Sequence, residues 1–267
     1  MLNTVTCKRK NTLGMIVGFA QALAASSPAQ TANPAVVSLV AECSTLANAD
    51  IRSAVGAPVH ITSASLVQGA KPAPYCKVLD YVEPAVKFEV RLPSGAWTQR
   101  FVQTGCGGLC GMVNVRLDHD DGCLPSRNGE LAVASTAMGH SGGNDGAFGA
   151  NDYQLRIDFS YRGVHVTTLA AKALISRYYG QGPKYSYFSG CSDGGREALM
   201  EAQRYPEDFN GIAAGAPAMN FTTQNTFQVV PAEALQWLGS GFYNARYQAW
   251  CSAKGTVMTG QSSRQGN

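Results

Sequence analysis

A serine lies at the centre of a glycine-bounded motif in the second half of the chain. Residues 190–194 read Gly-Cys-Ser-Asp-Gly and match the G-x-S-x-G pattern around Ser192. In this pattern the serine sits on a tight turn between a strand and a helix, which exposes its hydroxyl as a nucleophile. An ordinary glycine-rich turn is the alternative, and the neighbouring elements decide between the two. We expect Ser192 to be a catalytic serine.

The elements expected around Ser192 are those that the pattern requires. Residues 185–189 are predicted to form a short strand, and apolar residues at intervals of three or four predict a helix from 195 to 205, before Pro206. A longer helix is predicted from 159 to Gly180. Further strands are expected at 59–67, 75–82, 86–92, 100–104, 131–136 and 211–215. This order indicates an α/β fold, with a mostly parallel sheet and flanking helices.

A serine nucleophile also needs hydrogen-bond donors for the oxyanion that forms during acyl transfer. In this architecture one donor is the backbone N–H of the next residue, here Asp193. The loop at 105–111 follows the strand expected at 100–104, and it alone has a suitable composition for the second donor. Gly107 and Gly108 would let a carbonyl oxygen approach the backbone directly. A turn stapled by a disulfide is a compatible structural role for this loop.

Several linked motifs resemble the tannase and feruloyl esterase family of α/β-hydrolases over about residues 35–225. They are the loop at 105–111, A-S-T at 134–136 with G-H-S-G at 139–142, D-F-S-Y-R-G-V-H at 158–165, G-C-S-D-G-G-R-E at 190–197 and R-Y-P-E-D-F-N-G-I at 204–212. The resemblance implies an α/β-hydrolase-like fold. It also implies hydrolysis of small esters of aromatic (hydroxycinnamic or gallic-like) acids through an acyl-serine. No cofactor is implied, because the calcium ion that family members hold in a lid matches no residue here.

The resemblance also implies cysteine pairings. In the family, the cysteine before the nucleophile, here Cys191, pairs with a cysteine beside the catalytic histidine, and that partner has no counterpart in this chain. An early pair matching Cys43 and Cys76 is implied, and Cys110 with Cys123 is a further expected pair. A zinc site is the alternative for this region, and it would use Cys106, Cys110, Cys123 and His119.

The sequence lacks a histidine after the serine. In α/β-hydrolases the acid and then the histidine follow the nucleophile, whereas His60, His119, His140 and His165 all precede Ser192. We therefore expect a fold that is incomplete on its C-terminal side. A serine esterase is one hypothesis, and a non-catalytic truncated homologue or gene fragment without the general base is the other.

Weaker alternatives concern the remaining polar residues. His140 is a possible substitute base, whereas His165 fits a packed histidine in a helix. Asp208 lies too early in the chain for the triad acid. Residues 106–123 suggest a secreted metal- or sugar-binding module, and the acidic residues around His119 suggest a cation site.

The first 24 residues are typical of a secretory signal peptide, because Lys8, Arg9 and Lys10 precede an apolar run. A membrane anchor is the alternative, but that run is shorter than a membrane span. Residues 25–230 would form the partial catalytic domain and residues 231–267 an irregular tail. Without the signal, 18 cations balance 18 anions, which excludes a basic nucleic-acid surface. We expect a secreted or periplasmic protein without membrane contact after cleavage, and possible self-association through an exposed sheet edge.

Overall fold

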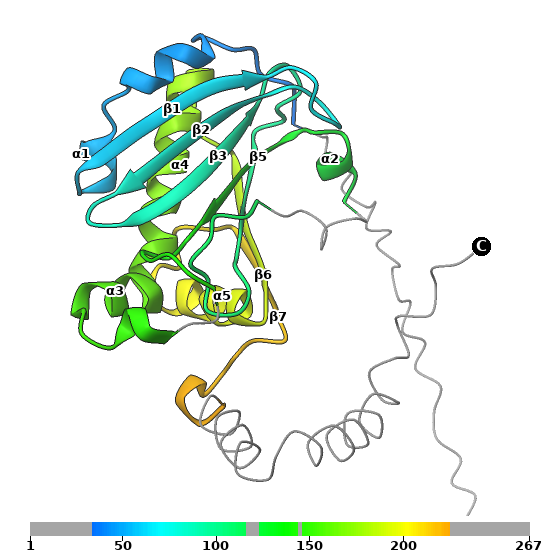
Figure 1. Ribbon diagram of the computed structural model, residues 1–267. Coiled ribbons are helices and arrows are strands. Elements are labelled where there is room, and N and C mark those ends of the chain that lie inside the picture. Colours follow the sequence, from blue (N-terminus) through cyan, green and yellow to red (C-terminus); the bar gives the residue numbers. More distant parts are fainter. Residues whose placement is uncertain (1–33, 116–122, 144–145, 225–267) are drawn as a thin grey trace, which may run out of the picture. The chain divides into compact units, whose positions relative to one another are not determined.

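The computed structural model describes residues 34–115, 123–143 and 146–224. The chain divides into two compact units, and every described residue belongs to the second, which begins at Pro34. The expected signal peptide at 1–24, the tail at 231–267 and His119 lie outside the described residues. The described part is built on one seven-stranded sheet with helices packed against it (Figure 1).

The seven strands lie in the sheet order β1-β2-β3-β5-β4-β6-β7. All seven form where the sequence predicts strands: β1 (Val59–Val67), β2 (Tyr75–Val82), β3 (Val86–Pro93), β4 (Arg100–Thr104), β5 (Leu131–Thr136), β6 (Tyr185–Cys191) and β7 (Gly211–Gly215). Strands β5, β4, β6 and β7 pair in parallel, as expected around Ser192. The other half is antiparallel, from β1 to β5. The sheet is therefore mixed rather than mostly parallel, because the short turns joining β1 to β2 and β2 to β3 permit only antiparallel pairing.

Two long helices flank the parallel half. Helix α4 (Gly163–Tyr179) packs against β3 and β5, and it ends at Gly180, which has a φ of 72°. Helix α5 (Asp193–Arg204) follows β6 directly and packs against β6 and β7 (Figure 1). The predicted start of the first helix at 159 is a π-helical turn, η4 (Asp158–Arg162), which joins α3 (Tyr153–Ile157) to α4. The α/β-hydrolase-like prediction is confirmed for this part of the chain.

Besides α3, four short helices are not predicted from the sequence. They are η1 (Cys43–Asn48), α1 (Arg52–Val55), α2 (Leu124–Arg127) and η3 (Gly146–Gly149). Each spans six residues or fewer, which is too short for an apolar period to be recognised.

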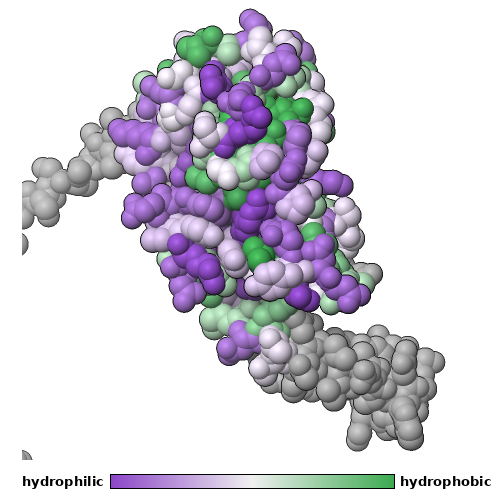
Figure 2. Space-filling model, turned by 90° about the vertical axis from the view of Figure 1, so that its left-hand side faces the viewer, coloured by the Kyte–Doolittle hydropathy of each residue, from purple (hydrophilic) through white to green (hydrophobic). Residues whose placement is uncertain are grey.

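The hydrophobic core lies between the sheet and its helices. Its largest fully buried side chains include Trp97, Tyr178, Phe88, Phe101 and Phe188. The face drawn in Figure 2 is mostly hydrophilic, and its apolar residues form small patches. Among the described helices, none has the length and apolar character needed to cross a bilayer.

Candidate active site

Ser192 occupies the turn between β6 and α5. Its backbone has φ 62° and ψ −117°, a combination that a residue with a Cβ rarely adopts and that lies outside the usual left-handed region. The N–H of Ser192 donates to Gly215 O at 3.1 Å, while its carbonyl accepts from Gly195 N at 3.0 Å and from Ala218 N at 3.0 Å. These bonds hold the strained turn in place. The serine itself is exposed, so its hydroxyl is accessible.

Glycines around Ser192 are required by close backbone approach. A Cβ on Gly190 would lie 2.4 Å from Gly194 O, and a Cβ on Gly195 would lie 2.4 Å from Gly215 O. Both distances are far below contact distance, and both involve backbone atoms that cannot rotate away. Helix α5 can therefore begin this close to β6 and β7 only because these positions are glycine.

The loop at 105–111 lies directly beside the start of α5. Gly194 N donates to Cys106 O at 2.8 Å, and Gly105 N donates to Ser189 O at 2.9 Å. Gly108, with a φ of 64°, lines the same cavity as Ser192 and Asp193. The loop and the residue after Ser192 thus lie beside the same cavity. Gly107 lies next to Gly108 and is exposed.

The described residues form two disulfides, and one expected pairing is wrong. Cys43 is bonded to Cys76, as the resemblance implies. Cys110 is bonded to Cys106, four residues away, and Cys123 is an exposed free thiol. The short Gly-rich loop brings Cys106 next to Cys110, so the local pair forms in place of Cys110–Cys123. Cys191 is free and exposed. Because Cys106 and Cys110 are bonded to each other, neither supplies a thiolate for the alternative zinc site.

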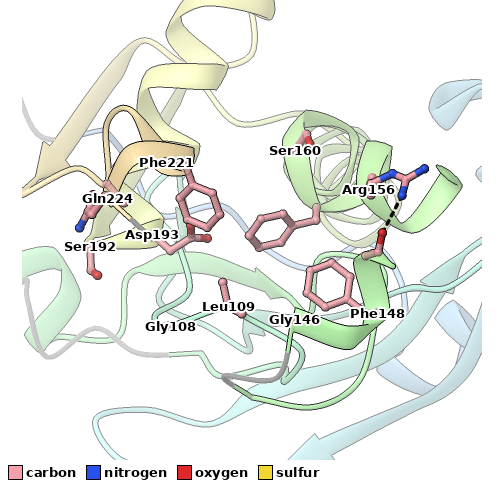
Figure 3. A pocket seen from close by; sticks show the side chains of 13 residues that line it. Gly108, Leu109, Gly146, Phe148, Arg156, Ser160, Ser192, Asp193, Phe221 and Gln224 are labelled. Carbon is pink, nitrogen blue, oxygen red and sulfur yellow. Dashed lines mark hydrogen bonds between the residues drawn. The ribbon is translucent and has the colours of Figure 1, made fainter. Parts of the chain in front are cut away.

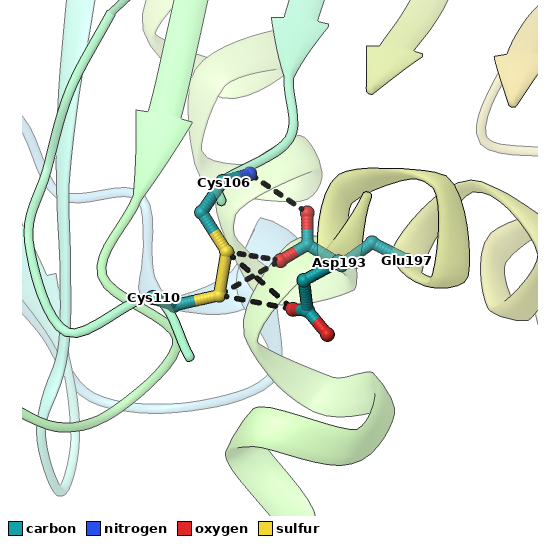
Figure 4. Close-up of side chains that lie close together, drawn as sticks. All are labelled: Cys106, Cys110, Asp193 and Glu197. Atoms are coloured by element: carbon teal, nitrogen blue, oxygen red, sulfur yellow. Dashed lines mark hydrogen bonds between the residues drawn. A yellow bond between two sulfur atoms is a disulfide. The ribbon is translucent and has the colours of Figure 1, made fainter. Parts of the chain in front are cut away.

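The Cys106–Cys110 disulfide packs against two buried carboxyl groups of α5 (Figure 4). Cys106 Sγ lies 2.9 Å from Glu197 Oε1, and Cys110 Sγ lies 3.2 Å from Asp193 Oδ2. Cys106 N also donates to Glu197 Oε2 at 3.2 Å. Burial, reinforced by the charge of Asp193, raises the pKa of Glu197 to about 8. A carboxyl group that holds its proton at neutral pH can donate to a sulfur atom, so Glu197 ties the loop to α5.

Arg196 ties the start of α5 to the π-helical turn. Its guanidinium bonds both carboxylate oxygens of Asp193, with Nε 2.7 Å from Oδ1 and Nη2 3.0 Å from Oδ2. It also donates to the backbone carbonyls of Ser160 and Phe159 at 3.0 Å each. The guanidinium carbon lies 4.4 Å from the centre of the Phe159 ring. Asp193 and Phe159 are therefore held in a fixed position relative to each other.

A cavity of about 840 Å³ opens beside Ser192. Figure 3 shows the labelled side chains of Phe221 and Phe148 along the cavity between Ser192 and Arg156. The ring centre of Phe159 lies 5.2 Å from that of Phe148 and 5.8 Å from that of Phe221. Three aromatic rings therefore line the approach to the serine, which suits a flat apolar group.

No histidine among the described residues hydrogen-bonds Ser192. His140 is buried, stacks on Phe148 with 3.6 Å between ring centres, and its Nδ1 lies 3.3 Å from Met138 O. It is not among the residues that line the cavity, and no hydrogen bond joins it to Ser192, so it does not act as the substitute base in this arrangement. His165 Nδ1 bonds Asp208 Oδ2 at 2.6 Å, and His60 Nε2 bonds Glu83 Oε1 at 2.7 Å.

The sequence analysis did not predict the buried carboxyl groups of α5. Of the apolar positions that predict this helix, Gly195 and Ala198 are buried but Leu199 and Ala202 are exposed. Glu197 and Glu201 are buried as well. Asp193, Glu197 and Glu201 recur at intervals of four, which places them on one face. This four-residue spacing could have indicated that the three carboxyl groups share a buried face. Carboxylates are rarely buried, so the sequence analysis expected only apolar residues on that face.

Known proteins are similar to this chain in sequence and in fold. The family model described as "Tannase and feruloyl esterase" matches residues 67–245. A probable feruloyl esterase B-1 of Neosartorya fischeri is 44% identical over 133 residues, which are 50% of this chain and 24% of that protein. An uncharacterized esterase of Xanthomonas campestris pv. campestris is 34% identical over 217 residues, which are 79% of this chain and 36% of that protein. The chain thus spans about a quarter to a third of these relatives.

Solved structures give the same result. Feruloyl esterase B from Aspergillus oryzae is 30% identical with a TM-score of 0.56, and the match covers 67% of this chain and 37% of that one. Tannin acyl hydrolase from Aspergillus niger is 25% identical with a TM-score of 0.50, and the match covers 69% of this chain and 38% of that one.

Proposed function

Because the chain belongs to the tannase and feruloyl esterase family, we propose that it is a carboxylic ester hydrolase in which Ser192 forms an acyl-enzyme. The observation that carries this proposal is the backbone of Ser192, with φ 62° and ψ −117°, at the junction of β6 and α5. A strained, exposed serine at a strand-to-helix turn is the nucleophile geometry of α/β-hydrolases.

In the proposed reaction, Ser192 Oγ attacks the ester carbonyl carbon and the carbonyl oxygen becomes an oxyanion. The backbone N–H of Asp193 and the Gly107–Gly108 segment supply the donors for that oxyanion, which requires α5 and the loop to keep their spacing. Glu197, Arg196 and the Cys106–Cys110 disulfide hold this spacing through the contacts described above. The proton of the Ser192 hydroxyl passes through solvent water to the departing alkoxide oxygen, so that the alcohol leaves and an acyl-serine remains. Water then attacks the acyl-serine, which releases the carboxylic acid and returns the proton to Ser192 Oγ.

The proposed substrates are small esters of aromatic acids of the hydroxycinnamic or gallic type. The rings of Phe148, Phe159 and Phe221 support this choice, since they line the cavity next to Ser192. Methyl ferulate should be preferred over methyl acetate, and Phe159→Ala should reduce that preference by about 10-fold to 100-fold. Tyr153→Ala is the matched control, because Tyr153 is 71% exposed and does not line the cavity.

A fluorophosphonate probe tests the nucleophile directly. Covalent labelling at Ser192, found by peptide mass spectrometry and absent in Ser192→Ala, is the expected result. No labelling of the folded chain would remove the enzyme proposal. Such a result would support the other hypothesis, a non-catalytic homologue, which the missing histidine contact to Ser192 within the described residues favours.

We also propose export from the cytosol and cleavage of the segment at 1–24. The basic cluster before an apolar run supports this, and so do the two disulfides. The N-terminal residue of the protein recovered from the periplasm or the medium tests it. Self-association through β7, the last strand in the order of the described sheet, is a further prediction, which light scattering coupled to size-exclusion chromatography would check.

A further inference from the structure

A second cluster of ionisable side chains lies between α4, α5 and the turn before β7, away from Ser192. It contains His165 from α4, Glu201 from α5 and Asp208 from the turn. One ligand atom of each residue lies within 4.8 Å of the others. Glu201 is eight residues beyond Asp193, where α5 begins, so the cluster lies about 12 Å along the helix from the residue after Ser192.

Glu201 is the unusual member of this cluster. Its side chain is fully buried at 0% exposure, and neither carboxylate oxygen has a hydrogen-bond partner among the described residues. An ionised carboxylate without a donor or a cation in the interior is strongly unfavourable. The two oxygens of Glu201 are therefore free to bind a cation.

Lys172 is nearby but does not fill that role. Its ammonium is hydrogen-bonded to the backbone carbonyl of Asp208 and lies 5.7 Å from the centre of the Phe209 ring. No hydrogen bond joins it to either carboxylate of the described cluster. Its positive charge partly offsets the negative charge of the cluster, but it donates no hydrogen bond to the carboxylate oxygens.

We propose that His165, Glu201 and Asp208 form a binding site for one divalent transition ion of the Zn²⁺ type. An imidazole nitrogen with two carboxylate oxygens is a ligand set that Zn²⁺ accepts, and the nitrogen disfavours Ca²⁺ and Mg²⁺. His165 Nδ1 and Asp208 Oδ2 are 2.6 Å apart. Two ligands of a tetrahedral zinc are about 3.3 Å apart, so a shift below 1 Å would admit the ion.

The surroundings favour a defined site. The His165 ring stacks on Tyr205 with 3.8 Å between centres and an interplanar angle of 7°, which fixes its orientation. The His165 side chain is 25% exposed and that of Asp208 is 10% exposed, so an ion can enter from solvent. The ion would link α4, α5 and β7, and its effect would be on stability. This inference does not depend on the proposed catalytic role of Ser192.

Titration of the full chain with Co²⁺, a coloured substitute for Zn²⁺, tests the proposal. We expect a visible ligand-field spectrum that saturates at one ion per chain, without a thiolate-to-cobalt charge-transfer band. Zn²⁺ should displace the cobalt, and at 100 times its Kd it should raise the Tm by about 5 °C or more. Glu201→Gln and His165→Gln should each weaken binding at least 10-fold, whereas Lys172→Met should strengthen it about 10-fold by removing a repelling charge.

Glu207→Gln is the matched control, because Glu207 is an exposed carboxylate next to Asp208. It should leave the Kd unchanged within about twofold. Glu201→Gln keeps the shape of the side chain and removes a buried charge, so its Tm without metal should not fall. If saturation at one ion is absent, or if Glu201→Gln binds cobalt as tightly as the wild type, the proposal is wrong.

Discussion

Replacing Ser192 with glycine should make the protein more stable. At φ 62° and ψ −117° the backbone of Ser192 is in a region that disfavours any residue with a Cβ. The surrounding hydrogen bonds to Gly215, Gly195 and Ala218 hold this conformation. Glycine adopts it without strain, whereas alanine keeps the Cβ and therefore keeps the strain. The comparison of Ser192→Gly with Ser192→Ala thus isolates the energy stored at the turn.

The expected difference follows from two opposing terms. A residue held in such a region is strained by about 1–3 kcal/mol. Glycine also makes the unfolded chain more flexible, which offsets about 0.4–1 kcal/mol of that gain. We therefore expect Ser192→Gly to exceed Ser192→Ala in unfolding free energy by about 1 kcal/mol, or about 2–4 °C in Tm for a chain of this size. The hydroxyl is exposed, so its loss should change stability little in either variant.

Urea unfolding followed by circular dichroism, with the disulfides intact, measures this difference. Both variants lack the nucleophile, so both should lose fluorophosphonate labelling, and only stability should separate them. If Ser192→Gly is no more stable than Ser192→Ala, the turn is unstrained and the nucleophile proposal loses its main support.

Three further predictions concern the scaffold. Gly190→Ala should lower the unfolding free energy by about 3 kcal/mol, because its Cβ would lie 2.4 Å from Gly194 O; Gly69→Ala, with open space around it, should show little change in the same urea titration. Burial raises the pKa of Asp80 from 3.8 to about 7. Between these two pH values the native state keeps a proton on Asp80 that the unfolded chain has lost, so the unfolding free energy falls as the pH rises from about 4 to about 7. Asp80→Asn should therefore gain up to about 4 kcal/mol over the wild type between pH 3 and pH 8, and parallel curves would contradict this. Replacing Cys43 and Cys76 together with alanine should lower the unfolding free energy by about 4 kcal/mol, because their disulfide closes a loop with a sequence separation of 33; an equal midpoint in urea would contradict it.

Much of the fold follows from the sequence because its elements have clear boundaries. The strands are short runs between glycine and proline turns, and each strand forms within two residues of its expected range. The turn at Ser192 is also predictable, since G-x-S-x-G lies between a strand and a helix. The antiparallel pairing of β3 with β5, which are not consecutive strands, and the choice of Cys106 rather than Cys123 as the partner of Cys110 are different, because residue types alone do not reveal them.

The buried face of α5 could not be predicted in full from the apolar periodicity of the sequence. Apolar periodicity predicts that Ala198, Leu199 and Ala202 are buried, but of these only Ala198 is. The helix also buries Asp193, Glu197 and Glu201. Each of these carboxyl groups is buried for a local reason: Asp193 pairs with Arg196, Glu197 contacts the 105–111 loop, and Glu201 faces His165 and Asp208. Directional polar contacts add to side-chain packing in fixing the rotation and the height of this helix. The position of Ser192 relative to the loop therefore depends on these buried polar contacts as much as on the glycines of the turn.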